Sequence, residues 1–145
     1  MQNLLPIVRE SWGWTGCNPV EVVAVNAFGN LILRDDEGRF WRLCPEDVYC
    51  RIVAQSRADY DALLGSEDFL SDWEMIELVR AARENLGVPG SGRCYCLKLP
   101  GVLGGEYGGD NLATTSLPEL IAFSGDFGRQ IKDLPDGTQI ELEVE

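Results

Sequence analysis

Short apolar runs separated by turn residues occupy positions 20–54 of the chain. Runs of this length, bounded by Gly, Asn, Asp and Pro, are typical of β-strands. Gly29, within the turn at 26–30, is free to adopt a positive φ. Connections this short join antiparallel neighbours. The pattern therefore predicts a meander of four strands, over residues 20–25, 31–33, 39–43 and 48–54.

Apolar residues spaced three and four apart predict a short helix at the N-terminus. Its apolar positions are Leu4, Leu5, Val8 and Trp12. The segment Ser11–Gly16 breaks this helix and brings Trp12 and Trp14 to either side of one glycine. We expect the two tryptophans to plug one end of the core, with an exposed aromatic patch as the alternative.

Two more helices are predicted after residue 54. Ser56 caps the first, which ends at Leu64 before a glycine. Ser71-Asp-Trp-Glu74 forms a capping box for the second, which ends near Leu86. The predicted buried stripe of this second helix is Met75, Ile76, Val79, Ala82 and Leu86.

The C-terminal third predicts two strands around a glycine-rich loop, then a helix and a last strand. Ser116-Leu-Pro-Glu119 is a capping box, so a helix should run from there to near Asp133. The turn tripeptide Pro135–Gly137 follows, and Thr138–Val144 alternates in polarity like a half-buried strand. The apolar stripe of this helix is Leu117, Leu120, Ile121, Phe127, Ile131 and Leu134. We expect it to pack on a sheet that contains 94–97 and 140–144.

The order of these elements predicts an α+β fold, a mostly antiparallel sheet with helices packed on one face. A chain of 145 residues corresponds to a single domain spanning 1–145. No run of 18 apolar residues is present, and the N-terminus lacks the pattern of a signal peptide. We therefore expect a cytoplasmic protein without a membrane partner.

The balance of charges is strongly acidic, with 24 Asp and Glu against 12 Lys and Arg, a net charge of −12. Direct binding to nucleic acid needs positive charge, so the balance disfavours it. The same charge favours association with a basic partner. The chain has no histidine, which excludes Ser-His-Asp and Cys-His catalytic pairs and histidine-based metal sites.

Three other patterns could carry chemistry. Cys94 and Cys96 share one face of a strand and could form half a zinc site, but we expect five reduced, buried cysteines, with no metal and no cofactor. The loop Gly101–Gly109 lacks the context of a phosphate-binding loop. A pair of acids could converge as in a glycosidase or a magnesium site, although turn acids mostly serve solubility. Those acids are Asp35, Asp36, Glu37, Glu46, Asp47, Glu106, Asp110 and Asp136.

Several segments resemble a bacterial domain of unknown function found at the C-terminal end of type VI secretion immunity proteins, often behind a GAD-like domain. The segments are Gly16–Pro19, Val25–Ile32, Pro45–Asp47, Gly92–Cys96, Leu103–Tyr107 with Asn111, and Gln130–Gly137. This family looks like a branch of the SUKH superfamily of immunity proteins. The resemblance implies a curved, mostly antiparallel sheet backed by helices, no catalysis, and neutralisation of a toxin by binding.

Three functional hypotheses follow. The first is a non-enzymatic immunity protein that binds a cognate bacterial toxin, with a basic nuclease as the favoured target. The others are a regulatory module that binds a peptide or protein, and a small hydrolase that uses carboxylates and a metal. For the first hypothesis we expect toxin contacts at the turn carboxylates Glu46, Asp47, Asp110 and Asp136.

Overall fold

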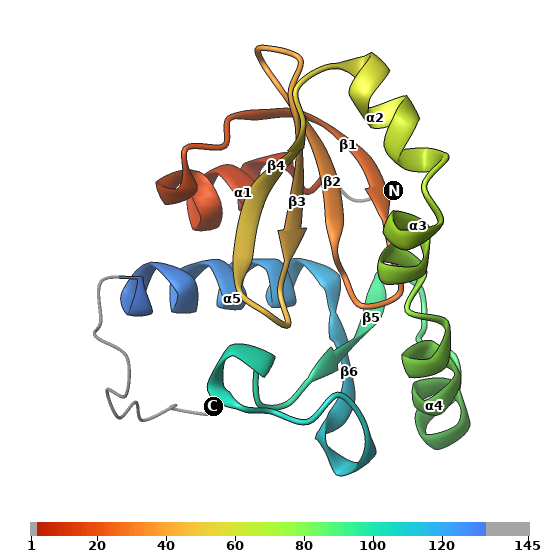
Figure 1. The fold of residues 1–145 in the computed structure, drawn as a ribbon. Coiled ribbons are helices and arrows are strands. Elements are labelled where there is room, and N and C mark those ends of the chain that lie inside the picture. The colour runs from red at the N-terminus through yellow and green to blue at the C-terminus, as the bar shows by residue number, and fades with distance from the viewer. Residues whose placement is uncertain (1–2, 133–145) are drawn as a thin grey trace.

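The computed structural model describes residues 3–132 (Figure 1). Its helices are α1 (Leu5–Trp12), α2 (Arg57–Leu64), α3 (Glu67–Glu74), α4 (Ile76–Leu86) and α5 (Leu117–Ile131). Three short 3-10 helices are η1 (Gly13–Thr15), η2 (Gly101–Leu103) and η3 (Gly109–Asn111). The strands are β1 (Pro19–Val25), β2 (Leu31–Asp35), β3 (Phe40–Cys44), β4 (Tyr49–Ala54), β5 (Arg93–Leu97) and β6 (Leu112–Ser116). None of the helices in this part of the chain is long and apolar enough to cross a membrane.

The first four strands form one antiparallel sheet in the order β1-β2-β3-β4, so the predicted meander and the α+β class are confirmed. The sequence predicted helices on one face of the sheet, whereas helices cover both faces of this one. Leu31, Leu33 and Leu43 point to the face covered by α1 and α5. Alternate residues Ile32 and Phe40 point to the other face, where α2 and α3 pack. Because side chains alternate along β2 and β3, these strands contribute residues to two hydrophobic cores, one on each face of the sheet.

The strands β5 and β6 pair with each other in a separate antiparallel sheet. The β1–β2 turn joins the two sheets, because Phe28 packs on Tyr95 and the Tyr95 amide donates to the carbonyl of Ala27 at 2.9 Å. Gly29 in this turn has φ +71°, as predicted, and a Cβ there would lie 2.9 Å from Leu120. The junction of the sheets thus requires glycine at this position.

The predicted C-terminal helix is confirmed as α5, and its Ser116 cap accepts from the amide of Glu119 at 3.5 Å. Phe127 is buried and Leu120 and Ile131 are half-buried, as the apolar stripe requires. The helix contacts α1 as well as β5 and β6. The predicted turn at 135–137 and strand at 138–144 lie outside the described residues.

The predicted start of the helix at Ser71 is wrong. Ser66 caps an earlier helix, α3, and the carbonyl of Ser71 accepts from the amide of Met75 at the end of α3. Met75 then adopts a left-handed conformation, with φ 49°, and α4 begins. This break lets α3 cover the large sheet through Phe69 and Trp73 while α4 covers the small one. One straight helix could not pack on both.

The buried side of α4 agrees only in part with the predicted stripe. Of the predicted stripe, Ile76 and Leu86 are exposed, at 56% and 43%. Leu78 and Ala81 pack against the small sheet in their place, beside the expected Val79 and Ala82. The predicted stripe is therefore confirmed for Met75, Val79 and Ala82 and wrong for Ile76 and Leu86.

Trp12 and Trp14 close one end of the core, as predicted. Trp12 is completely buried and Trp14 is half-buried. The Trp12 indole donates to the carbonyl of Ile121 at 2.9 Å, and the Trp14 indole donates to that of Gly125 at 3.0 Å. Such close approach depends on a small residue on α5. A Cβ at Gly125 would lie 2.4 Å from the carbonyl oxygen of Ser11.

We expect Gly125→Ala to lower the free energy of unfolding by about 2 kcal/mol, because the methyl group meets backbone that cannot move aside. Gly13→Ala is the matched control: a Cβ there meets nothing within 4 Å. Its effect should stay within about 0.5 kcal/mol. Urea unfolding of both variants measures the difference. Equal stabilities would contradict the close contact of α1 with α5.

Candidate functional site

A buried polar network lies where the large sheet meets α3. Asn30 is completely buried, and Arg42 and Glu46 are 4% and 5% exposed. The Arg42 Nε donates to Asn30 Oδ1 at 3.1 Å, and Asn30 Nδ2 donates to both carboxylate oxygens of Glu46, at 3.0 and 2.8 Å. The guanidinium also pairs with Asp72 of α3 and lies 5.3 Å from the ring centroid of Trp73. One amide thus links a buried cation to a buried anion.

Burial makes the Glu46 carboxyl group harder to ionise. Desolvation raises the pKa of this carboxyl above its ordinary value, and the hydrogen bonds from Asn30 oppose the shift only in part. The sequence suggested an exposed turn carboxylate at this position. That premise is wrong for Glu46, because its side chain turns inward from the β3–β4 hairpin toward Asn30.

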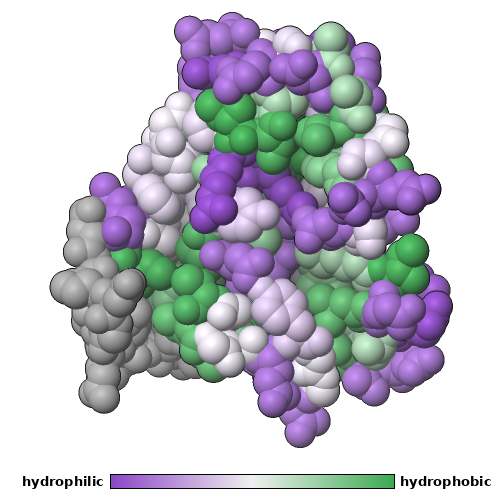
Figure 2. Space-filling view, in the orientation of Figure 1, coloured by the Kyte–Doolittle hydropathy of each residue, from purple (hydrophilic) through white to green (hydrophobic). Residues whose placement is uncertain are grey.

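An open cleft of about 430 Å³ lies beside this network, and we call it the acidic cleft. Its walls come from the end of β3, the β3–β4 turn, the α3–α4 junction and the glycine-rich loop. Figure 2 shows hydrophilic residues crossing the middle of the face seen in Figure 1, with hydrophobic areas on either side. The residues that line the cleft include four acids and one arginine: Arg42, Glu46, Asp47, Asp72 and Glu77, with Tyr49, Tyr107, Met75, Leu78 and Ala81.

The glycine-rich loop holds the β3–β4 turn in place. The amide of Gly101 donates to the Glu46 carbonyl at 2.6 Å, and the Tyr107 hydroxyl donates to the Asp47 carboxylate. A Cβ at Gly101 would lie 2.3 Å from the Tyr107 hydroxyl, so the contact requires glycine. Asn111 closes the loop from its base by accepting from the amide of Leu99 at 2.8 Å. The loop is therefore a tight structural connection that holds the β3–β4 turn.

The four predicted toxin contacts lie in different environments. Asp47 is half-buried in the acidic cleft, and desolvation raises the pKa of its carboxyl. Asp110 is exposed on η3 and does not line the cleft. Glu46 lines the cleft but is buried, and Asp136 lies outside the described residues. The structure adds Asp72, Glu77 and Tyr107, which sequence reasoning did not select.

Asp35, another turn acid considered for catalysis, has a structural role. It is fully buried, and its carboxylate accepts from the Trp41 indole at 2.9 Å and from the Arg39 amide and guanidinium at 2.8 and 2.7 Å. Burial alone would raise the pKa of Asp35, but these hydrogen bonds outweigh it and lower the pKa to about 2. Asp36, Glu37 and Glu106 are exposed.

The cysteines are suited to packing more than to chemistry. Four are buried and Cys96 is half-buried. Burial raises the pKa of Cys94 to about 12 and also raises that of Cys96. Thiols that stay protonated are weak nucleophiles and weak metal ligands. Within residues 3–132, no three His, Cys, Asp or Glu side chains are grouped so that they could hold a metal ion.

The comparison with protein families identifies the class of this α+β chain. The model of the family described as T6SS immunity protein Tdi1, C-terminal, matches residues 54–128, just over half of the chain. The chain belongs to this family of type VI secretion immunity domains. No curated protein matches it. The matched segment begins at the end of β4, so Asp72 and Tyr107 fall within it, whereas Asn30, Arg42 and Glu46 precede it.

A substitution at Glu46 tests the electrostatics of the network. A carboxyl whose pKa is raised by folding stabilises the protein fully below its unfolded pKa, and this stability is lost as pH rises through the folded pKa. Glu46→Gln keeps an oxygen to accept from Asn30 and removes the charge. We expect the variant to gain stability relative to the wild type as pH rises above about 4.5 toward neutrality.

Denaturant unfolding at a series of pH values measures this difference. Glu84→Gln, on the exposed side of α4, serves as the control and should track the wild type throughout. If the difference between Glu46→Gln and the wild type stayed constant with pH, the carboxylate would not be under the desolvation described above.

Proposed function

We propose that this chain is a non-enzymatic immunity protein that binds and neutralises a cognate type VI toxin, and that the toxin is a nuclease with a basic surface. Membership of the immunity family carries the proposal. The net charge of −12 supports a basic partner, because opposite charges steer two proteins together and raise the rate of association. Nucleases need basic surfaces to hold phosphates.

The acidic cleft is the site that we assign to this contact. Asp47, Asp72 and Glu77 converge there around a single arginine, and Arg42 is already paired with Asp72. A basic side chain of the toxin entering the cleft would meet more carboxylates than cations. Asp110 stays a proposed contact at the exposed end of the glycine-rich loop, and Asp136 stays a prediction from the sequence alone.

The contacts within the cleft favour binding over catalysis. Asn30 occupies both oxygens of Glu46, Tyr107 and Cys44 contact the carboxylate of Asp47, and Arg42 pairs with Asp72. Catalytic carboxylates need an oxygen free to meet water, substrate or metal. The hydrolase hypothesis therefore has less support than binding, and the absence of histidine from the sequence points the same way.

Charge reversal at the cleft residue Glu77 and at the second proposed contact, Asp110, tests the proposal. The product of the neighbouring toxin gene is co-purified with this chain, and association rates are measured at low and high salt. Glu77→Lys with Asp110→Lys should reduce the low-salt association rate by about tenfold or more and flatten its salt dependence. Both side chains are exposed, so the fold should be unaffected.

The matched control is Glu10→Lys with Asp61→Lys. These substitutions make the same change in charge at two exposed acids on α1 and α2, away from the cleft. Its effect on the rate should be clearly smaller. Equal effects of the two pairs would show that total charge, rather than the cleft, directs association. Failure of the toxin to bind or to be inhibited by the wild-type chain would refute the immunity function for that toxin.

A further inference from the structure

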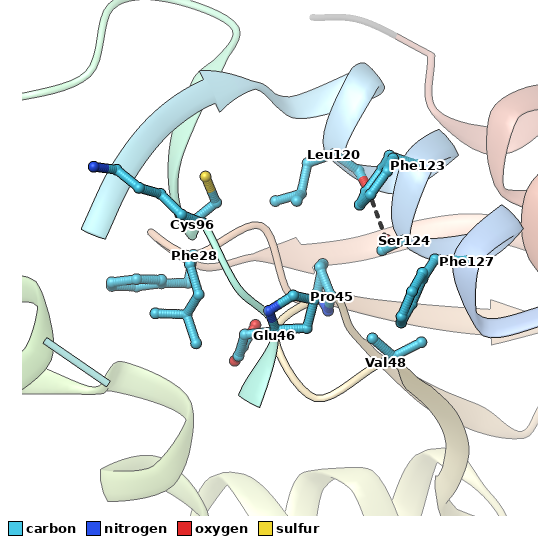
Figure 3. Close-up of a pocket in the computed structure, with 12 residues that line it drawn as sticks. Phe28, Pro45, Glu46, Val48, Cys96, Leu120, Phe123, Ser124 and Phe127 are labelled. Atoms are coloured by element: carbon cyan, nitrogen blue, oxygen red, sulfur yellow. Dashed lines mark hydrogen bonds between the residues drawn. The ribbon is translucent and has the colours of Figure 1, made fainter. Parts of the chain in front are cut away.

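A small apolar pocket lies on the opposite side of the β3–β4 turn from the acidic cleft. Figure 3 shows Leu120, Phe123 and Phe127 of α5 on one side of it and Pro45 and Val48 of the turn on another. Glu46 lines both the pocket and the cleft. The turn Pro45–Val48 is therefore a ridge between an apolar hollow and an acidic one.

The size of the pocket determines what it can hold. Its volume is about 40 Å³. Sites for free small molecules measure roughly 300–1,000 Å³, so no cofactor or metabolite fits. A volume of this order holds only the tip of an aliphatic side chain, such as a methyl group of Val or Leu. Pockets that receive one apolar anchor from a partner are typical of binding hot spots.

The mouth of the pocket carries exposed aromatic surface. Phe123 is 52% exposed and stacks on Phe127, with ring centroids 6.2 Å apart. Val102, in the 3-10 turn that follows the lining residue Pro100, is 51% exposed. A large side chain half in water and half against a pocket gains most when a partner covers it.

The ridge is held rigidly before any partner arrives. Val48 has φ 55°, a conformation that β-branched residues rarely adopt. It is kept there by close packing, since a Cβ at Gly128 would lie 2.8 Å from its Cγ1. On its other side, Gly101 and Tyr107 bond the turn. A preorganised surface loses little entropy on binding, which favours affinity.

We propose that the toxin presents an amphipathic segment across this ridge, with the tip of one aliphatic side chain in the apolar pocket and a lysine or arginine in the acidic cleft. The inference rests on the proposed function and names the partner's chemistry at the same site. Complementary charge selects the occupant, because Asp47, Asp72 and Glu77 lie on the far side of the ridge. A second copy of the chain, also at −12, would be repelled.

The test compares Phe123→Ala with Val88→Ala, a truncation at a 77% exposed valine that lines none of the pockets described here. Binding to the purified cognate toxin is measured by surface plasmon resonance. Phe123→Ala should raise Kd by about tenfold or more, mainly through faster dissociation. Val88→Ala should leave Kd unchanged. Thermal melting checks that both variants are folded.

A second measurement uses the unaltered chain. Cys96 lines the pocket and is the half-buried cysteine, so complex formation should slow its alkylation by iodoacetamide, as followed by mass spectrometry. If Phe123→Ala bound the toxin with unchanged Kd and Cys96 stayed unprotected in the complex, this inference would be overturned. The immunity function would still stand, because the complex forms. A free chain that is dimeric in light scattering, and becomes monomeric on Phe123→Ala, would assign the pocket to a second copy and overturn it too.

Discussion

The site depends on one constraint: a buried arginine and a buried glutamate are linked to each other by the side-chain amide of one asparagine. Arg42 and Glu46 are both buried, and Asn30 lies between them with its carbonyl toward the guanidinium and its amino group toward the carboxylate. Removing Arg42 or Glu46 would leave a polar atom of the buried Asn30 side chain without this partner, which costs about 1–3 kcal/mol. The three residues come from the β1–β2 turn, β3 and the β3–β4 turn, so the network fixes the two turns relative to the sheet.

Contacts from the β1–β2 turn and from α3 connect this buried network to the walls of the cleft. Asn26 shapes the β1–β2 turn by accepting from the amide of Asn30 at 2.9 Å and donating to the Trp73 carbonyl at 2.9 Å. The neighbouring Asp72 reaches Arg42, and the break at Met75 then turns α4 away to form a wall of the cleft. The family match starts at the last residue of β4, so the network joins the matched segment to the large sheet. A rigid ridge with an acidic side and an apolar side follows from these contacts.

Much of the fold could be predicted from the sequence because its local signals agree with the tertiary structure. The four strands, the Ser116 cap and the positive φ of Gly29 all express preferences that the core reinforces. Two features could not be predicted. The helix break at Met75 has no glycine or proline to mark it and exists because two sheets must be covered. Glu46 follows a proline and precedes an aspartate, as in a solvent-exposed turn. Its burial is explained only by Asn30, which lies in the distant β1–β2 turn and donates to its carboxylate.

The central claim is that the β3–β4 ridge, with the acidic cleft beside it, is the toxin-binding surface. Hydrogen–deuterium exchange of the free chain and of its complex with the cognate toxin tests this claim most directly. The account predicts slower exchange on binding in peptides that cover Cys44–Cys50 and the loop 98–111, with little change along the edge strand β1. Protection confined to β1 and α1, with none at the ridge, would contradict it.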